Sequence, residues 1–433
     1  MKPQLFTNVQ VFDGSGTPSR PAEVLVVGNT IKKVTSGADT LARESEIDVV
    51  DGGGQTLMPG LVEAHAHITY TNITFLKELG VIPIEEHTML TLLNAKLMLD
   101  SGFTSLYSAA SSKIRVEVAV RNAINAGSFP GPRMRAASPE MVATGGLGDE
   151  RQLHMHHQGI EVIADGPDEV RKTVRMLIRE GVDTIKVNVS GDDFVRQGFG
   201  KRLSYTEAEV AAAAEVAHER GAWLSAHARA DSAVKLALKY KFRMIYHCDF
   251  IEGETFDLLE AQRDSVFLAP AIGLIYTTAH EAAPFGISRE VAEHMGMFAM
   301  LEGAPRVYRE LKKRGLRILP GGDYGFAWNP IGTNARDLEH FVNLFGFTPA
   351  EALMAATKWG GELMDVGKLG LVQPGYLADL IMVDGNPLRD IKCLQNRDKI
   401  TMVMKDGVYY KHPSQRVLAR AVAHSARSAW ETA

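Results

Sequence analysis

The 433-residue sequence predicts a (β/α)₈ barrel of the TIM type, joined to a small β-sandwich domain built from both ends of the chain. Three observations lead to this fold class. Short apolar runs alternate with amphipathic helical runs through the middle of the chain, a pattern typical of parallel sheets. Short strands without helices between them occupy both ends. Candidate metal ligands lie on, or directly after, several of the central strands, where a barrel builds its active site.

The first 57 residues are expected to form the first part of the small β-domain. Gly-, Ser- and Pro-containing turns divide this stretch into short strands. The predicted strands cover residues 4–12, 22–28, 30–35 and 46–57.

Residues 58–367 are expected to form the barrel. Helical runs at 84–100, 168–180, 205–219 and 232–239 lie between apolar strands, and eight strand–helix units favour a closed barrel over an open sheet. The eight predicted strands cover residues 57–63, 104–108, 133–138, 183–189, 222–227, 243–248, 265–270 and 316–321.

The end of the chain is expected to return to the small β-domain. Pro349 directly after Thr348 indicates a helix start, because proline suits the first helical position. Strands then follow at 378–383, 400–405 and 408–411, within a second part of the β-domain at 368–412. Residues 413–433 have the pattern of an amphipathic C-terminal helix.

The composition is that of an ordinary globular enzyme or binding protein. Hydrophobic residues make up 45% and charged residues 23%, and the net charge of −5 gives no reason to expect a nucleic-acid partner. The sequence has no uninterrupted apolar run of about 18 residues, so we expect no membrane span. The two cysteines are too few for a disulfide framework, and the first residues lack an apolar signal core, so we expect a cytoplasmic protein.

Two histidines at the end of the first predicted barrel strand are the leading candidates for metal ligands. His65 and His67 follow the apolar run that begins at Pro59. Because strand side chains alternate between faces, residues two apart point the same way. The imidazoles can therefore bind one metal ion together, although a hydrogen-bonded pair of histidines would show the same spacing.

Lys186 lies in the middle of the apolar strand 183–189. Burying an ammonium group costs much free energy, so a lysine there either extends its amine to solvent or has another chemical form. Carboxylation by CO₂ would give an anionic carbamate with two oxygens, which could bridge two metal ions.

Three further candidate ligands lie at the ends of later strands. His227 and His247 end consecutive predicted strands, and Asp323 follows the last one. Each residue alone is more often structural: a core histidine, or an aspartate in a turn. Together with His65, His67 and Lys186 they make six positions that fit one template. A carboxylate at Asp323 could also accept a proton from a metal-bound water.

The order His-x-His, Lys, His, His, Asp over eight strands resembles the amidohydrolase superfamily, in its binuclear metal type. The segments 59–67 and 374–384 resemble its first-strand and closing β-domain signatures. The sequence is similar to the imidazolonepropionase-like and prolidase-like members, including amidases that act on N-acyl amino acids. The resemblance implies two divalent ions, which we expect to be zinc. It implies that His65, His67 and Asp323 bind one ion, that His227 and His247 bind the other, and that carboxylated Lys186 bridges them.

Three positions depart from the pattern of the family. Glu63 stands where an aspartate is usual before the first histidine, Leu147 stands where a histidine is frequent, and Tyr246 replaces a frequent glutamate. The expected metal core is therefore complete, whereas the groups around the substrate differ.

The predicted activity is hydrolysis of an amide-like C–N bond in an amide, N-acyl amino acid, carbamate or urea. Water bridging two cations is acidified and available as hydroxide near neutral pH. Asp323 takes its proton and passes it to the leaving nitrogen. A deaminase is disfavoured because Ala230 stands where such enzymes usually have glutamate. A decarboxylase or a lactonase is the remaining alternative, and a non-catalytic scaffold should have lost ligands.

The loops predict a small, hydrophobic or aromatic substrate. Long loops at 139–166 and 270–300 follow the third and seventh strands, as active-site lids often do, although apolar loops can also pack between subunits. We expect a homo-oligomer. The candidate substrate contacts are Leu147, Arg151, His154, Tyr246 and Tyr276, and Arg196 and Lys201 are further candidates for holding a carboxylate.

Overall fold

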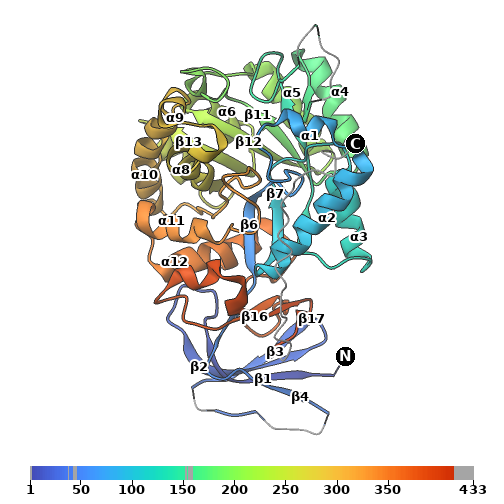
Figure 1. Ribbon diagram of the computed structural model, residues 1–433, viewed down its shortest axis with the longest axis vertical. Helices are drawn as coiled ribbons and strands as arrows, with labels where there is room; N and C mark the ends of the chain where they lie inside the picture. Colours follow the sequence, from blue (N-terminus) through green and yellow to red (C-terminus); the bar gives the residue numbers. More distant parts are fainter. Residues whose placement is uncertain (1, 38, 42–45, 152–153, 155–158, 414–433) are drawn as a thin grey trace.

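The computed structural model describes residues 2–37, 39–41, 46–151, 154 and 159–413. Figure 1 shows a helix-covered barrel above a small sheet domain that both ends of the chain share. The helix predicted over 413–433 lies outside the described residues, except for Pro413.

The small domain joins strands from the two ends of the chain in one sheet. Its strand order is β17-β16-β15-β5-β1-β2-β3, with β4 beside β1. The two ends meet where Leu380 of β15 lies opposite Pro59 of β5 in an antiparallel pair. The strands are β1 (Gln4–Val11), β2 (Arg20–Val27), β3 (Thr30–Val34), β4 (Asp48–Asp51), β5 (Thr56–Pro59), β15 (Leu380–Val383), β16 (Ile400–Lys405) and β17 (Val408–Lys411).

This sheet folds back on itself around one apolar core. The amide of Ile31 donates to the carbonyl of Tyr376 at 2.8 Å, and the amide of Ala378 donates to that of Asn29 at 2.8 Å. Phe6, Val24 and Met402 belong to the same buried cluster. Strands from both ends of the chain therefore share one core.

Parallel strands form the barrel wall in two hydrogen-bonded groups, β6-β7-β8 and β9-β11-β12-β13-β14, with β10 at the edge of the second. β8 and β9 are two halves of the third strand, separated at Ala136, whose carbonyl accepts from the amide of Asp183 at 2.8 Å. The strands are β6 (Leu61–Ala66), β7 (Phe103–Ser108), β8 (Arg133–Arg135), β9 (Ala137–Val142), β10 (Glu161–Ile163), β11 (Thr184–Asn188), β12 (Trp223–Ala230), β13 (Met244–Phe250) and β14 (Phe267–Ala269).

The segment 316–321 closes the barrel without forming a regular strand. The amide of Leu319 donates to the carbonyl of Leu268 on β14 at 2.8 Å, and the amide of Ala64 on β6 donates to that of Pro320 at 3.2 Å. A full strand was predicted here, but only a single bridge forms, between Leu268 and Ile318. The reason is that Pro320 has no amide hydrogen to donate to a ladder.

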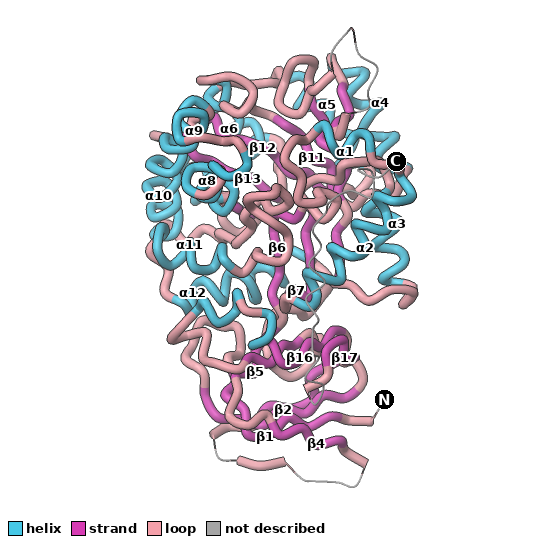
Figure 2. Tube along the Cα trace, in the orientation of Figure 1, coloured by secondary structure: helices cyan, strands magenta, loops and turns pink. Residues whose placement is uncertain are grey.

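Helices surround the strands of the barrel (Figure 2). Capping boxes begin α5 at Thr206 and α12 at Thr348, the latter with Pro349 at the first helical position as predicted. The larger helices are α2 (Ile84–Asp100), α3 (Val116–Asn125), α4 (Gly166–Arg179), α5 (Glu207–Glu219), α6 (Asp231–Lys239), α8 (Ile272–His280), α10 (Met297–Lys313) and α11 (Arg336–Phe345). Shorter ones are α1 (Lys77–Val81), α7 (Thr255–Ala261), α9 (Arg289–His294), α12 (Pro349–Met354) and α13 (Gly360–Met364).

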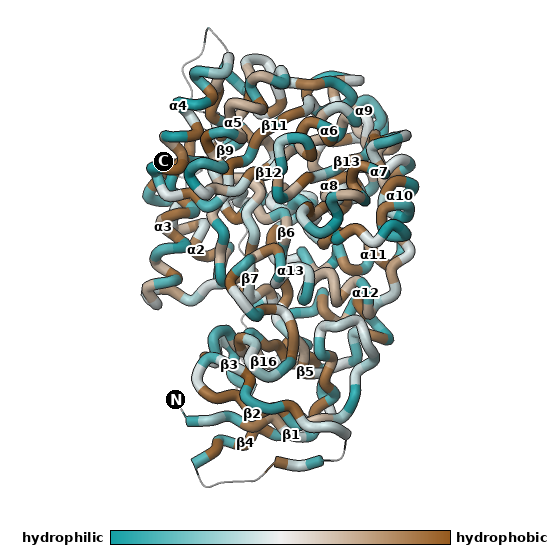
Figure 3. Tube along the Cα trace, turned by 180° about the vertical axis from the view of Figure 1, so that it is seen from behind, coloured by the Kyte–Doolittle hydropathy of each residue, from teal (hydrophilic) through white to brown (hydrophobic). Residues whose placement is uncertain are grey.

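The outer helices bury one face each. On α10 the buried residues include Met300, Ala304, Val307 and Leu311, at spacings of three and four. Figure 3 accordingly shows hydrophobic and hydrophilic stretches mixed along α10. No helix in the described part of the chain is both long and apolar enough to cross a lipid bilayer.

Candidate active site

All six predicted metal-ligand residues line one cavity of about 550 Å³. The carboxyl ends of parallel strands meet at one end of a barrel, which brings together side chains far apart in sequence. The residues come from β6, β11, β12, β13 and the segment after Pro320; they are His65, His67, Lys186, His227, His247 and Asp323.

His65, His67 and Asp323 form a compact group. Oδ1 of Asp323 lies 3.7 Å from Nε2 of His65 and 3.1 Å from Nε2 of His67. A nitrogen of each imidazole and an oxygen of the carboxylate all lie within 4.8 Å of one another. This spacing is suited to holding one metal ion.

His227 and His247 form a second group beside the first. Their ring centroids are 4.4 Å apart, and the His247 ring lies 5.5 Å from that of His65. The side chain of Lys186 is buried, with its Nζ 4.6 Å from the centre of the Tyr246 ring. The amine therefore remains inside the barrel and does not extend to solvent.

Burial keeps these groups in forms that can bind a cation. Desolvation lowers the pKa values of His65, His227 and His247 well below the usual range, so the imidazoles are neutral. Desolvation also lowers the pKa of Lys186, which favours the free amine that carboxylation requires. Burial opposes ionisation of Asp323, but the adjacent His65 and His67 outweigh it and lower the pKa of this carboxyl.

In two of the imidazole rings, those of His67 and His227, one nitrogen is hydrogen-bonded. Nδ1 of His67 lies 3.1 Å from the carbonyl of Ala110, and Nε2 of His227 lies 3.3 Å from the carbonyl of Gly191. Donation to these carbonyls leaves the other nitrogen of each ring with a free lone pair. Within the described residues, Nδ1 of His65 and of His247 is buried without a hydrogen-bond partner. Neutral imidazoles with free lone pairs are suited to binding divalent cations. Histidines that only stabilise a core usually have both ring nitrogens hydrogen-bonded.

The backbone is strained at two of the candidate ligands, His247 and Asp323, and at Cys248 beside His247. Their φ angles are 76° for His247, 58° for Asp323 and 58° for Cys248. This left-handed region costs a residue with a side chain about 1–3 kcal/mol. The hydroxyl of Tyr308 donates to the carbonyl of His247 at 2.7 Å and helps to hold the turn. Such strain concentrates at functional sites. Cys248 itself is a buried free thiol.

Of the predicted substrate contacts, Leu147 lines the cavity, and Tyr246 and Tyr276 do not. Tyr246 is fully buried against the ring of His65, at 4.0 Å, and its hydroxyl donates to the carbonyl of Ala64. Tyr276 lies on α8, two residues after the cavity residue Leu274. Residues two apart on a helix face different sides.

The predicted contacts Arg151 and His154 also lie outside the cavity wall. The guanidinium of Arg151 pairs with Glu161 at 2.8 Å, and His154 is exposed to solvent. Arg196 and Lys201 lie over Phe199 and Phe250 and are likewise not part of the wall. The charge of a loop residue alone does not show which way it faces.

An aromatic wall leads from the ligands to the cavity mouth, and sequence reasoning missed most of it. The ring of Tyr70 stacks on His67 at 4.3 Å and meets Phe326 at 5.8 Å. Phe326 stacks on Trp328 at 5.2 Å, and Trp328 meets Phe285 at 6.2 Å. Phe285 belongs to the predicted lid, which consists of short helices and turns. The other rings follow ligands closely in sequence, a signal that could have indicated them.

Arg229 was also missed and is the largest fully buried side chain of the described residues. It lies two residues after His227, so strand alternation places both on one face. Its guanidinium donates to Asp192 and Asp249, and Asp249 lies two residues after His247. Arg229 therefore links the ends of the two strands that carry the second pair of histidines.

Replacing Arg229 by methionine should destabilise the protein by about 3–5 kcal/mol, because it leaves two buried carboxylates without their cation. Urea denaturation measures the loss. Arg229→Lys, which keeps the charge but not the planar fork, should lose less. A methionine variant as stable as the parent would contradict this role.

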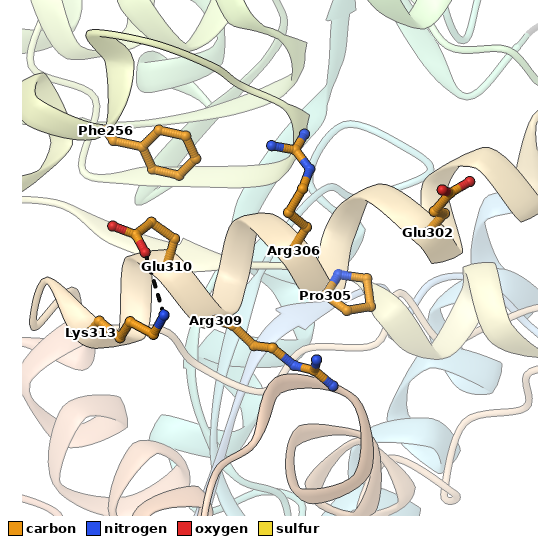
Figure 4. Close-up of a pocket in the computed structure, with 7 residues that line it drawn as sticks. All are labelled: Phe256, Glu302, Pro305, Arg306, Arg309, Glu310 and Lys313. Carbon is orange, nitrogen blue, oxygen red and sulfur yellow. Dashed lines mark ion pairs between the residues drawn. The ribbon is translucent and has the colours of Figure 1, made fainter.

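A second depression lies on the outer surface, between α7 and α10. Figure 4 shows its seven lining residues, with Lys313 paired to Glu310 at 3.8 Å. None of the candidate ligands is among them, and Arg309 donates to the carbonyl of Leu344. The cavity at the carboxyl ends of the strands is therefore the candidate active site.

Comparisons with known proteins agree with this geometry. The model of the Amidohydrolase family matches residues 56–409. An ochratoxinase from Aspergillus niger is 27% identical over 432 residues, covering 93% of this chain and 85% of the relative. An imidazolonepropionase from Rubrobacter xylanophilus is 25% identical over 403 residues, covering 89% and 90%.

Among solved structures, a Xaa-Pro dipeptidase with bound methionine in its active site superposes with a TM-score of 0.82 at 27% identity. The match covers 95% of this chain and 100% of that one. The family match spans most of the sequence and includes all six candidate ligands. The chain belongs to the amidohydrolase family and is a metal-dependent hydrolase of C–N bonds.

Proposed function

We propose that the enzyme hydrolyses an amide-like C–N bond in a small hydrophobic or aromatic molecule. The observation that carries this proposal is the convergence of His65, His67, Lys186, His227, His247 and Asp323 in one cavity that also has an aromatic wall.

In this proposal, His65, His67 and Asp323 would hold one divalent ion, and His227 and His247 would hold a second. Lys186, once carboxylated by CO₂, would serve both ions, and zinc is the proposed metal because imidazole and carboxylate ligands suit it. Bound ions at these positions supply Lewis acidity and lower the pKa of water to near neutrality. The buried amine of Lys186 and the neutral imidazoles support this assignment.

Asp323 acts as the general base and then as the general acid. Its carboxylate accepts a proton from the attacking water, whose oxygen bonds to the substrate carbonyl carbon. The C–N bond then breaks, and Asp323 returns the proton to the leaving nitrogen. With an amide substrate the products are a carboxylic acid and an amine.

The aromatic wall supports a substrate with an aromatic or bulky apolar group. Tyr70, Phe326, Trp328 and Phe285 follow one another from His67 outward. Burial and the charges of Glu140 and Asp323 raise the pKa of Tyr70, so its phenol stays neutral. Stacking against such rings adds about 0.5–1.5 kcal/mol to the burial of apolar area.

Hydrolysis of a mixed panel tests the proposal: aryl amides, N-acyl amino acids, aryl carbamates, phenylureas and lactones. We expect cleavage of at least one C–N member with zinc and bicarbonate, its loss after chelation, and its return when zinc is restored. Chelator already saturated with zinc is the control. Cleavage that chelation does not affect would contradict the metal mechanism. Release of ammonia or CO₂ alone would favour a deaminase or a decarboxylase.

Two further properties stay predictions. The buried free thiols of Cys248 and Cys393 support a reducing, cytoplasmic location. Homo-oligomeric assembly is expected from the resemblance to the family and can be measured by light scattering.

A further inference from the structure

Tyr70 is the residue of the aromatic wall that carries a hydroxyl, and it lies next to a candidate ligand. Its ring stacks on that of His67, with centroids 4.3 Å apart and planes 22° apart. The rest of the wall, Phe326, Trp328 and Phe285, continues from it toward the mouth of the cavity. An apolar contact alone would need only the ring, so the hydroxyl calls for a separate explanation.

The hydroxyl of Tyr70 is open to the cavity. The side chain is 4% exposed and lines the cavity wall. Within the described residues this hydroxyl makes no hydrogen bond, yet it is not among the unpaired groups that are sealed from solvent, whereas the hydroxyls of Tyr324 and Tyr409 are. Because a buried tyrosine hydroxyl usually has a hydrogen-bond partner, we expect a bound molecule to supply one here.

Hydrogen bonds fix the backbone at Tyr70. Its amide donates to the carbonyl of His67 at 2.9 Å. The side-chain amide of Asn94 on α2 donates to the carbonyl of Ile68 at 2.9 Å and to that of Tyr70 at 3.4 Å. These bonds hold the turn that follows the first pair of candidate ligands. The phenol therefore needs little reorganisation when a substrate binds, as a catalytic hydrogen-bond donor requires.

Gly325 brings Tyr70 close to the segment that carries Asp323. It lies two residues after Asp323, and a Cβ atom at this position would be 2.3 Å from the Cβ of Tyr70. Two carbons cannot approach so closely without displacement, so the contact requires a glycine. Tyr70 is therefore positioned by two segments that supply ligands of the same proposed ion, through His67 and through Gly325.

The proposed reaction needs a donor at this place. When water attacks the carbonyl carbon, negative charge develops on the carbonyl oxygen, and a fixed hydrogen-bond donor stabilises that charge. The proposed base, Asp323, lies 3.1 Å from His67, on whose ring Tyr70 stacks, so the phenol is on the side of the cavity where attack occurs. A phenol has an ordinary pKa of about 10 and keeps its proton near neutral pH.

We propose, on the basis of the proposed function, that the Tyr70 hydroxyl donates a hydrogen bond to the carbonyl oxygen of the bond that is cleaved. This hydrogen bond strengthens as negative charge develops on that oxygen. The phenol keeps its proton, and no bond to Tyr70 forms or breaks. Tyr70 is then a further catalytic residue, while its ring remains part of the aromatic wall.

Tyr70→Phe tests the proposal, because it keeps the ring and removes only the hydroxyl. We expect kcat on the panel substrate that is cleaved best to fall by about 10²-fold with KM little changed, as for a donor that acts mainly in the transition state. Bound metal and stability to urea should match the parent, since the hydroxyl has no partner within the described residues. Parental kcat in the variant would overturn the proposal, and so would a loss of activity that only follows a loss of metal.

Tyr409→Phe is the matched control. Tyr409 lies on β17 of the small domain, outside the cavity, and its hydroxyl likewise has no partner in the part of the chain that the structure describes. This variant should keep the parental kcat and KM. Both variants remove one unpaired phenol hydroxyl, so a difference between them reports the position of Tyr70.

The leaving group separates a hydrogen bond to the carbonyl oxygen from proton donation to the leaving nitrogen. The anilide and the para-nitroanilide of one acyl group differ in the basicity of the amine that is released. A donor to the carbonyl oxygen should give a similar loss of kcat in Tyr70→Phe with both substrates. A loss that disappears with the para-nitroanilide would assign Tyr70 to the leaving nitrogen and overturn the proposal.

Binding separates failure of this proposal from failure of the proposed function. Phenylphosphonate carries a tetrahedral anionic group, as the attacked carbonyl does, and calorimetry on metal-loaded protein measures its affinity without turnover. Tyr70→Phe should bind it about tenfold more weakly, which corresponds to about 1.4 kcal/mol, and should bind benzamide with little change. If the parent cleaves no panel member but this affinity falls as expected, the donor role stands and the assigned reaction is wrong. If the parent cleaves amides but neither kcat nor this affinity changes in the variant, the donor role is wrong and the reaction stands.

Discussion

Asp323→Asn should lower kcat by about 10²–10⁴-fold, with KM little changed, because the substitution removes the group that transfers the proton in the transition state. Asparagine has the same shape and still offers an oxygen toward His65 and His67. The loss should therefore fall on the chemical step. Steady-state kinetics on the panel substrate that is cleaved best measures kcat and KM separately.

The metal content of the variant decides how this result is interpreted. Two ions per chain with low kcat would identify a proton-transfer role, whereas loss of an ion would show that Asp323 acts only as a ligand. Asp365→Asn is a matched control, since Asp365 is also in the left-handed region, with φ of 49°, but lies outside the cavity. Normal turnover in Asp323→Asn would contradict the assignment.

Lys186→Met should lower the rate of hydrolysis by at least about 100-fold. Loss of a residue that only supports a metal ligand already lowers activity by up to about 100-fold, and Lys186 is proposed to be a ligand itself. Methionine keeps the length and apolar character of the side chain but cannot be carboxylated. Metal analysis should find fewer than two ions per chain. In the parent enzyme, ¹³C-bicarbonate should give a carbamate signal in the NMR spectrum that the variant lacks.

Stability without metal separates a ligand from a structural lysine. Because burial lowers the pKa of Lys186, its amine contributes no strong ion pair, and metal-free Lys186→Met should be at least as stable to urea as the metal-free parent. A marked loss of stability would indicate a structural role over the Tyr246 ring. Two bound ions and full activity in the variant would exclude the bridging role.

The sequence predicted most of the fold and the six candidate ligands that line the cavity. The α2 helix has the predicted bounds, and most barrel strands lie at or near the predicted apolar runs, whereas the last predicted strand forms only a single bridge. His65 and His67 could be recognised because their two-residue spacing is itself the geometric requirement. The same holds for Pro349 after Thr348, where the capping chemistry is local. Lys186 was noticeable because a buried ammonium is chemically unusual.

The substrate side of the cavity depended on tertiary structure. Tyr246 and Tyr276 were predicted to contact the substrate, but Tyr246 packs against His65 inside the barrel and Tyr276 packs against His340 of α11. Arg229 appeared as an ordinary charged residue until the structure placed Asp192 and Asp249 around it.

The fold and the substrate side of the cavity differ in how predictable they are because they depend on interactions over different distances along the chain. Strand alternation, helix capping and the cost of burying a charge act within a few residues, so the sequence predicted the fold class, and with the family resemblance it predicted the candidate ligands. The direction of a loop side chain and the make-up of a cavity wall depend on contacts between residues as distant as Tyr70 and Phe326, which only the folded chain brings to 5.8 Å.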